Sequence, residues 1–252
     1  MIGLEIAGAI ATATLARPPV NAIDEGWISR LHEVVGTCEG DSSISVLLIR
    51  SDQKAFSAGA DLALMRSRFD SIDGRKLMVA FVREMQRAYA RIEASRLVSI
   101  AEIGGAAMGG GLELALACDL RIASETAKLG LPEARLGLLP GAGGTQRLTL
   151  LCGQAVSKRL ILGAEVVDGA EAARIGVVQW AVPAGMLDSR AHEIANRVAQ
   201  LPSGSLTFCK RCIAAAGKPG QDGYAMEVSA SEELLASAET QSRVRRFLEG
   251  AR

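Results

Sequence analysis

Histidine is scarce in this chain, which has two histidines among its 252 residues. His32 and His192 lie in the amphipathic patterns "LHEVV" and "AHEIANRV", where a surface position on a helix is the ordinary interpretation. Catalysis of the Ser-His-Asp or Cys-His kind therefore has little support. No group of histidine, cysteine and aspartate has the spacing of a metal site, so we expect no bound metal ion.

Cysteine is also too sparse to stabilise the fold through a set of disulfide bonds. The five cysteines are an odd number and are scattered along the chain, which excludes a regular disulfide framework. Cys209 and Cys212 form a lone CxxC in "TFCKRCIAAA", and without a second pair they are better interpreted as two small residues on a helix than as a zinc or redox site. This cysteine usage predicts a reducing, cytoplasmic location.

Long apolar runs and an excess of one charge are missing as well. Because there is no run of about 18 or more apolar residues, we expect no membrane-spanning helix. The N-terminus lacks the basic segment of a signal peptide and alternates as strands do. Lys and Arg together number 28, as do Asp and Glu, and this balance argues against a nucleic-acid or membrane partner.

Short apolar runs alternate with amphipathic helical patterns, which favours an α/β fold. From about residue 186 onward helical patterns dominate and strand signals vanish. We therefore predict a core over residues 1–190, which holds the active site, and a helical region over residues 191–252. Strands are expected at 3–8, 9–16, 44–51, 97–103, 120–124 and 176–182, and helices at 25–39, 74–94, 145–163 and 168–175.

Glycine-rich loops paired with carboxylates remain as the chemistry-bearing feature. "AFSAGADL" places Gly59 before Asp61, "AMGGGLEL" places three glycines before Glu113, and "LPEARLGLLPGAGGTQRL" carries Glu133 ahead of another glycine run. None of these matches a phosphate-binding loop, because the Gly-Lys-Ser/Thr ending and the GxGxxG spacing are absent. Glycines at a helix N-terminus instead leave backbone N–H groups free, and two such groups aimed at one oxygen make an oxyanion hole.

Each of these residues also has a plainer interpretation. Asp61 can serve only as the N-cap of "LALMRSR". Glu113 can pair with an arginine such as Arg147, and Glu133 can be an exposed loop residue. The glycines can simply permit close packing of a helix against a strand. Taken singly, these alternatives stay open, and the joint order of the three segments decides between them.

In that order, the segments 54–62, 104–124 and 129–148 resemble the enoyl-CoA hydratase/isomerase (crotonase) superfamily. The resemblance implies a ClpP-like spiral of ββα units followed by a C-terminal helical region used in trimer contacts. It also implies a coenzyme A thioester substrate and no separate cofactor, since coenzyme A is part of the substrate. Assembly into homotrimers, or into hexamers as dimers of trimers, is expected on the same ground.

The resemblance further assigns roles within the site. The backbone N–H groups of Ala60 and Gly110 are expected to form the oxyanion hole for the thioester carbonyl. Glu113 is expected to activate water as a base, Glu133 to supply a proton as an acid, and the Gly141 backbone to help hold that water. The contacts to substrate and coenzyme A are expected from Ala58, Gly59, Ala60, Asp61, Leu62, Gly109 and Gly110.

Because both glutamate positions are filled, the resemblance favours a hydratase, a lyase that converts a 2-enoyl-CoA to a 3-hydroxyacyl-CoA. A Δ3,Δ2-enoyl-CoA isomerase, or a hydratase of a cyclic acyl-CoA, is the alternative within the family. A protein that binds RNA or a partner through the basic helix at 74–94 is a third hypothesis, against which the zero net charge argues. The pair Gly104–Gly105 departs from the family, which usually has asparagine before the second glycine.

Overall fold

Two sheets form the framework of the protein in the computed structural model, which describes residues 1–250. In the larger sheet, of order β1-β2-β3-β5-β7-β10, every neighbouring pair is parallel except the β1–β2 hairpin. The near-continuous apolar runs of the central strands fit this arrangement, because parallel strands are covered on both faces. The six strands are β1 (Ile2–Ala7), β2 (Ile10–Leu15), β3 (Val46–Ser51), β5 (Val98–Ile103), β7 (Leu120–Ser124) and β10 (Trp180–Val182).

A smaller sheet of order β4-β6-β8-β9 carries the loops of the candidate site. Three of its strands come directly after a strand of the larger sheet and shortly before a helix, so that strand, strand and helix repeat along the chain. β4 is not among the strands expected from the sequence, because a three-residue strand shows no periodicity. The four strands are β4 (Ala55–Ser57), β6 (Ala106–Met108), β8 (Lys128–Gly130) and β9 (Val166–Asp168).

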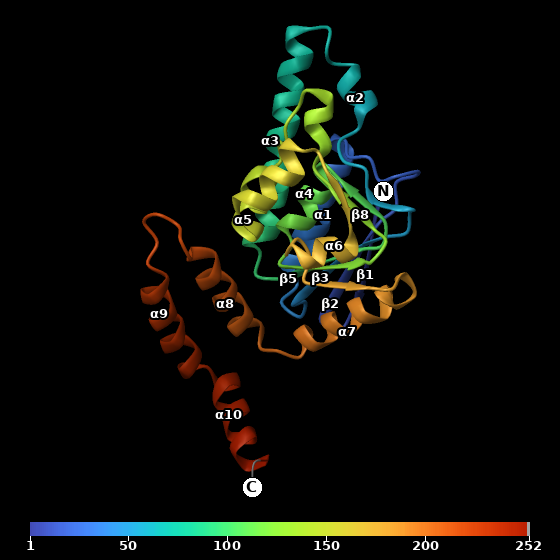
Figure 1. Ribbon diagram of the computed structural model, residues 1–252. Coiled ribbons are helices and arrows are strands. Elements are labelled where there is room, and N and C mark those ends of the chain that lie inside the picture. The colour runs from blue at the N-terminus through green and yellow to red at the C-terminus, as the bar shows by residue number, and fades with distance from the viewer. Residues whose placement is uncertain (251–252) are drawn as a thin grey trace.

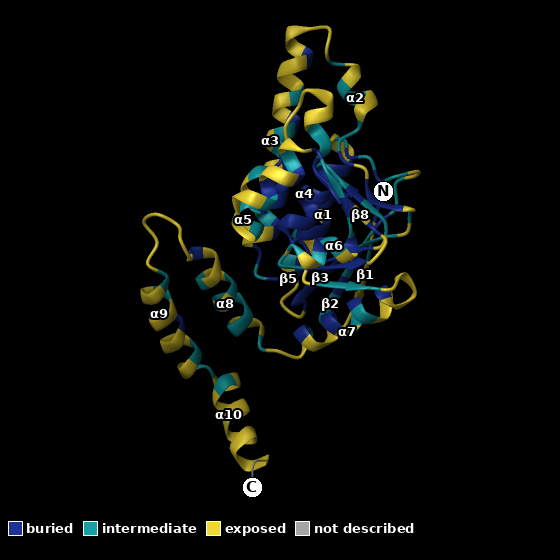
Figure 2. Ribbon diagram, viewed as in Figure 1, coloured by how far each residue is buried: buried dark blue, intermediate teal, exposed yellow. Residues whose placement is uncertain are grey.

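The repetition produces the expected spiral of ββα units, with its main helices gathered on one side of the larger sheet (Figure 1). All eight residues of α4 are buried, as expected for a helix that is apolar on every side (Figure 2). No helix within residues 1–250 is long and apolar enough to cross a membrane. The main helices of the spiral are α1 (Glu25–Gly40), α3 (Ile72–Ala94), α4 (Gly110–Ala117) and α5 (Gly144–Leu162), and the short ones are α2 (Leu62–Arg66), η1 (Pro132–Leu136) and α6 (Gly169–Arg174).

The other face of the larger sheet is covered by α7 (Leu187–Ala199), which follows the short turn η2 (Ala184–Met186). Ala191, Ile194 and Val198 of α7 are buried in one apolar cluster with residues of β3, β5 and β7. The boundary expected between residues 190 and 191 therefore falls inside a helix that packs on the core. We propose that the helical appendage begins after α7.

The appendage consists of α8 (Ser203–Ala215), α9 (Gly223–Ala236) and α10 (Ala238–Gly250), which extend away from the spiral (Figure 1). Lys210 of α8 fastens it to the core, since its Nζ donates to Asp119 Oδ2 at 2.8 Å and to Leu97 O at 2.8 Å. The appendage exposes large apolar side chains, a common mark of a protein-binding surface. These are Ile213, Tyr224, Val228, Leu235, Val244, Phe247 and Leu248.

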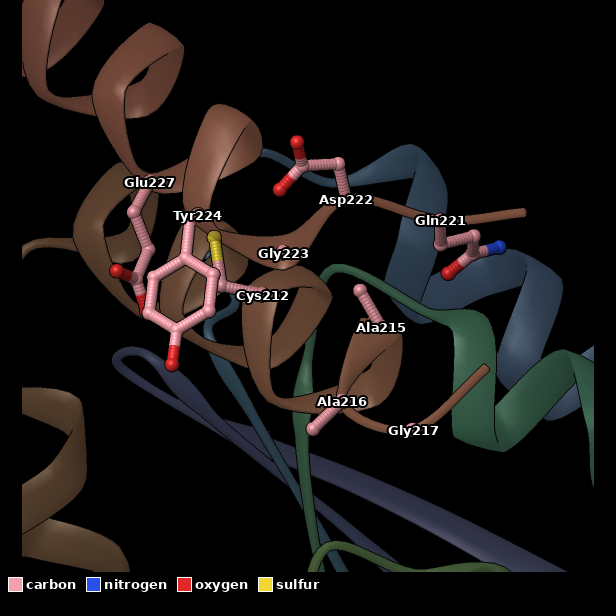
Figure 3. A pocket seen from close by; sticks show the side chains of 9 residues that line it. All are labelled: Cys212, Ala215, Ala216, Gly217, Gln221, Asp222, Gly223, Tyr224 and Glu227. Atoms are coloured by element: carbon pink, nitrogen blue, oxygen red, sulfur yellow. The ribbon is translucent and has the colours of Figure 1, made fainter. Parts of the chain in front are cut away.

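The crevice between α8 and α9 is separate from every residue expected in the active site. Its lining includes Cys212, Tyr224 and Glu227 (Figure 3). Cys209 and Cys212 both lie on α8, the helical position expected for them.

Candidate active site

Two backbone N–H groups without an acceptor face one space at the start of α4. Within residues 1–250, neither the Ala60 N–H nor the Gly110 N–H donates a hydrogen bond to protein. The two groups are close together, because a Cβ built on Gly110 would lie 3.6 Å from the Ala60 nitrogen. Two free donors beside each other are what an oxyanion hole requires.

Gly59 and Gly109 must be glycine, because other groups of the protein approach their backbones closely. Gly59 has φ +89°, and a Cβ on it would lie 2.8 Å from Met108 O and 3.1 Å from the Gly110 nitrogen. Gly109, with φ +49°, would place a Cβ 2.8 Å from Glu133 Oε1. Side chains at these positions would separate the two donors or displace the carboxylate.

The peptides that carry the two donors are each anchored through their carbonyl. Gly59 O, in the peptide of the Ala60 N–H, accepts from the Ile23 N–H at 2.9 Å. Gly109 O, in the peptide of the Gly110 N–H, accepts from the Glu113 N–H at 2.9 Å. A peptide bonded at its carbonyl is held in place and becomes a better donor at its N–H.

Asn21 supports the loop that carries Ala60, a role that the sequence did not indicate. The side chain is fully buried, and its Nδ2 donates to Ser51 Oγ at 2.8 Å, to Phe56 O at 3.0 Å and to Ala55 O at 3.2 Å. Its Oδ1 accepts from the Arg17 N–H at 2.8 Å. Both polar ends of the amide are therefore hydrogen-bonded, which fixes β4, the strand that leads into the loop carrying Ala60.

Replacement of Asn21 by aspartate is expected to destabilise the fold, because a carboxylate has no N–H to offer the three oxygens around Nδ2. The free energy of unfolding should fall by about 3 kcal/mol or more, as each unpaired buried polar group costs about 1–3 kcal/mol. Urea denaturation would measure it. The exposed Asn196→Asp is the matched control and should change the value by less than about 0.5 kcal/mol. Equal effects of the two substitutions would contradict this role of Asn21.

Asp61 does serve as an N-cap, as its plainer interpretation predicts. Its Oδ1 accepts from the N–H groups of Ala63 and Leu64 at the start of α2, and its Oδ2 lies 3.0 Å from Arg17 Nη2. The Leu64 N–H is the largest cause that lowers the pKa of this carboxyl. Leu62 is exposed as the first residue of α2, while the Ala58 N–H is already bonded to Val20 O. The contacts to coenzyme A expected from residues 58–62 stay a prediction.

Glu113 is buried in α4, 2% exposed, and its carboxylate faces the start of α5. Its Oε1 accepts from the Ala142 N–H at 2.8 Å and from the Gly144 N–H at 2.7 Å. The partial positive charge at the N-terminus of α5 also favours a carboxylate there. The alternative of an ion pair with Arg147 is wrong, because Arg147 pairs with Glu93 at 3.1 Å.

Glu133 reaches the same space from η1. Its Oε2 is buried and has no hydrogen-bond partner within residues 1–250, and its Oε1 lies against Gly109. The interpretation of Glu133 as an exposed loop residue is therefore wrong. A buried carboxyl oxygen with no protein partner is available to a water molecule, a proton or a substrate.

The environment of the two carboxyls raises both pKa values. Burial is the largest cause for Glu113, whose pKa rises to about 7, and the charge of Glu133 adds to the rise while the N–H donors of Gly144 and Ala142 oppose it. Burial also raises the pKa of Glu133. Neighbouring buried carboxyls tend to share one proton, which suits an acid and a base working as a pair.

Gly141 directly precedes Ala142, whose N–H donates to Glu113, and the Gly141 N–H donates to no protein acceptor in the described part of the chain. Its carbonyl accepts from Gln86 Nε2 at 2.6 Å. Gln86 lies on α3, and Tyr89, a buried residue of the same helix, donates from its hydroxyl to Gly110 O at 2.9 Å. Gln86 and Tyr89 were not found from the sequence, because they belong to an ordinary amphipathic helical pattern.

One group of possible metal ligands does occur elsewhere. Glu102, Asp188 and His192 offer atoms that lie within 4.8 Å of one another. Arg50 already pairs with Asp188 and lies 3.7 Å from Glu102, so a cation occupies this cluster. We assign no metal to it.

Comparison with known proteins identifies the family of this chain. The family model described as enoyl-CoA hydratase/isomerase matches residues 5–252. The chain belongs to the enoyl-CoA hydratase/isomerase family. Within that family it is 37% identical over 212 residues to the short-chain-enoyl-CoA hydratase of Clostridium acetobutylicum, covering 83% of this chain and 79% of that protein. It is also 37% identical over 191 residues to the crotonyl-CoA hydratase of Syntrophomonas wolfei, covering 75% and 72%.

Solved structures superpose on nearly the whole chain. Pseudomonas aeruginosa DspI superposes with a TM-score of 0.92 at 36% identity, covering 99% of this chain and 94% of that one. An enoyl-CoA hydratase of Geobacillus kaustophilus superposes with a TM-score of 0.93 at 29% identity, with the same coverage. The fold and family expected from the three sequence segments are confirmed.

Proposed function

We propose that this family member is an enoyl-CoA hydratase, a lyase that adds water across the 2,3 double bond of a 2-enoyl-CoA. One observation carries the proposal: Glu133 lies against Gly109, next to the free Gly110 N–H, and its charge acts on the buried carboxyl of Glu113. The hydratase names of its relatives support the same reaction.

In the proposed mechanism, the thioester oxygen accepts from the N–H groups of Ala60 and Gly110, which draws electrons from the 2,3 double bond. A water molecule held by the carboxyls and the free Gly141 N–H attacks carbon 3. The new C–O bond forms as one O–H bond of the water breaks, and that proton goes to Glu113. The electron pair of the double bond moves toward the thioester oxygen as an enolate, which the two N–H groups stabilise.

Glu133 then gives its proton to carbon 2, which completes the 3-hydroxyacyl-CoA. The hydrogen-bond pattern supports this division of roles. Two backbone N–H donors stabilise Glu113 as a carboxylate, whereas the unpartnered Oε2 of Glu133 is suited to hold a proton. Return of the proton from Glu113 to Glu133 restores the starting state, so one water is consumed and nothing else changes.

Double-bond isomerisation is the alternative, since it needs only a proton shuttle. Glu133 lies beside Gly109, at the oxyanion donors, where its carboxyl can move a proton between carbon atoms of a bound acyl chain. Assays of 2-enoyl-CoA and 3-enoyl-CoA with the parent and with Glu113→Gln separate the two. A hydratase loses its activity on the 2-enoyl substrate in that variant, whereas an isomerase working through Glu133 alone keeps its activity on the 3-enoyl substrate.

The proposal extends to the assembly. The exposed apolar side chains of α8, α9 and α10 support a homotrimer or a homohexamer, since such surfaces are normally covered by a partner. Sedimentation would test this, and a monomer at micromolar concentration would contradict it. Coenzyme A as part of the substrate, with no further cofactor and a cytoplasmic location, completes the proposal.

The direct test follows the loss of the conjugated enoyl thioester across a panel of 2-enoyl-CoA esters of different chain length and of cyclic acyl groups. Turnover of at least one ester to the 3-hydroxy product is expected. Absence of turnover on the whole panel would contradict the proposed function.

A further inference from the structure

A hydrogen-bond relay runs from the surface of α3 to Glu113. Gln86 Nε2 donates to Gly141 O at 2.6 Å. Gly141 O and the Ala142 N–H are the two ends of one peptide group, and that N–H donates to Glu113 Oε1 at 2.8 Å. Val82, one helical turn before Gln86, packs on the same glycine: a Cβ on Gly141 would lie 3.2 Å from Val82 Cγ1.

The second donor to Glu113 is anchored differently. The Gly144 N–H belongs to a peptide whose carbonyl, Gly143 O, accepts from the Arg147 N–H at 2.9 Å. The hydrogen bonding of α5 therefore fixes that peptide. The 141–142 peptide precedes α5, and within residues 1–250 only Gln86 bonds its carbonyl.

We propose that Gln86 is a positioning residue of the acid–base site, holding the 141–142 peptide in the orientation from which the Ala142 N–H donates to Glu113. The proposal rests on the proposed function, in which Glu113 exchanges a proton during hydration. Gln86 itself touches neither substrate nor reacting atoms. Gln86 fixes the peptide that carries the Ala142 N–H, whereas the hydrogen bonding of α5 fixes the peptide that carries the Gly144 N–H.

Two physical effects follow from this bond. A peptide bonded at its carbonyl is a stronger donor at its N–H, and a fixed peptide keeps the donor aligned. Both effects stabilise the ionised form of Glu113 and so oppose the rise in its pKa. The other charged or titratable groups that act on Glu113 are Glu133 from η1, Arg147 from α5 and Tyr89 from α3, and a change at Gln86 leaves all three in place.

The test is Gln86→Met, which keeps the length of the side chain and removes the amide donor. The carboxyl titration of Glu113 in the substrate-free protein, followed by carbon-13 NMR, is expected to move to higher pH by about half a unit. The limb of the kcat/KM profile that reports Glu113 should move by the same amount in the same direction. KM should stay within about twofold, because no substrate contact is lost.

Gln154→Met is the matched control, since Gln154 is exposed on α5 and its amide, among the residues described, accepts one bond, from Lys158 Nζ. It should leave the titration and the profile unchanged. A Gln86→Met protein with an unshifted Glu113 titration would overturn the proposal, as would a uniform fall in kcat at every pH. Because the NMR titration needs no turnover, it tests the relay even if the parent fails to hydrate any 2-enoyl-CoA, a result that would count against the proposed function alone.

Discussion

Glu113→Gln is expected to lower kcat for hydration of a 2-enoyl-CoA by about 10²- to 10⁴-fold, the usual contribution of a positioned acid or base. The glutamine oxygen can still accept from the Ala142 and Gly144 N–H groups, so the site should keep its shape. It cannot take a proton from water. Steady-state kinetics would measure the loss, and KM should change far less than kcat.

The same variant is expected to be more stable than the parent at pH 8. The pKa of Glu113 is about 7 in the folded protein against an ordinary value of 4.5, so folding disfavours its ionised form. The cost is absent below pH 4.5, grows between pH 4.5 and pH 7, and is complete above pH 7. Because one pKa unit corresponds to about 1.4 kcal/mol, Glu113→Gln should gain up to about 3 kcal/mol at pH 8 and almost nothing at pH 4.

Glu102→Gln is the matched control for the loss of rate. Glu102 is also buried, at 5% exposed, but it lies on β5 next to Arg50 and outside the site. Its replacement should leave kcat unchanged. If Glu113→Gln retained the parent's rate, or if it were no more stable than the parent at pH 8, Glu113 would not be the buried base described above.

Gly110→Ala is expected to lower kcat/KM by about 10²-fold or more, the scale measured when an oxyanion-hole donor is lost. The added methyl group would lie 3.6 Å from the Ala60 nitrogen and 2.8 Å from Met85 Cε. It would therefore compete with the thioester oxygen for the space beside the donors. The flexible Met85 side chain can move aside, so the protein should still fold.

Gly40→Ala provides the control for this substitution. Gly40 ends α1, and a Cβ there would meet nothing within 4 Å. Circular dichroism should show both variants folded, and only Gly110→Ala should be slow. A Gly110→Ala protein that hydrates substrate at the parent's rate would contradict an oxyanion hole formed by the Ala60 and Gly110 N–H groups.

The sequence could predict the larger sheet and the long helices, because these depend on apolar runs and helical periodicity that are visible locally. It could not predict β4, β6 or β8, since three residues carry no periodic signal. These short strands matter for the site, because each precedes one of its parts. β4 leads to Ala60, β6 to the glycines before α4, and β8 to Glu133. Gly105 has to be glycine, because a Cβ on it would lie 2.0 Å from Lys54 O. A Cβ on Gly104 would meet Leu187 at an ordinary 3.4 Å, so nothing in the structure explains glycine in place of the asparagine usual in the family.

Within the site, the sequence could locate the two glutamates and the glycines, but their partners depend on the tertiary structure. Glu113 is held by the N–H groups of Ala142 and Gly144, which lie 29 and 31 residues away along the chain. Backbone donors have no residue type, so no sequence pattern marks them. Gln86 is hidden for the same reason, because its bond partner is a backbone carbonyl 55 residues away.

The most direct test of the central claim is the initial rate at which crotonyl-CoA loses its conjugated enoyl thioester absorbance, compared among the parent, Glu113→Gln, Glu133→Gln and Glu102→Gln. We expect rapid hydration by the parent and by Glu102→Gln. The rates of Glu113→Gln and Glu133→Gln should each be lower by about 10²-fold or more. Equal rates for all four proteins would contradict the claim that Glu113 and Glu133 form the acid–base pair.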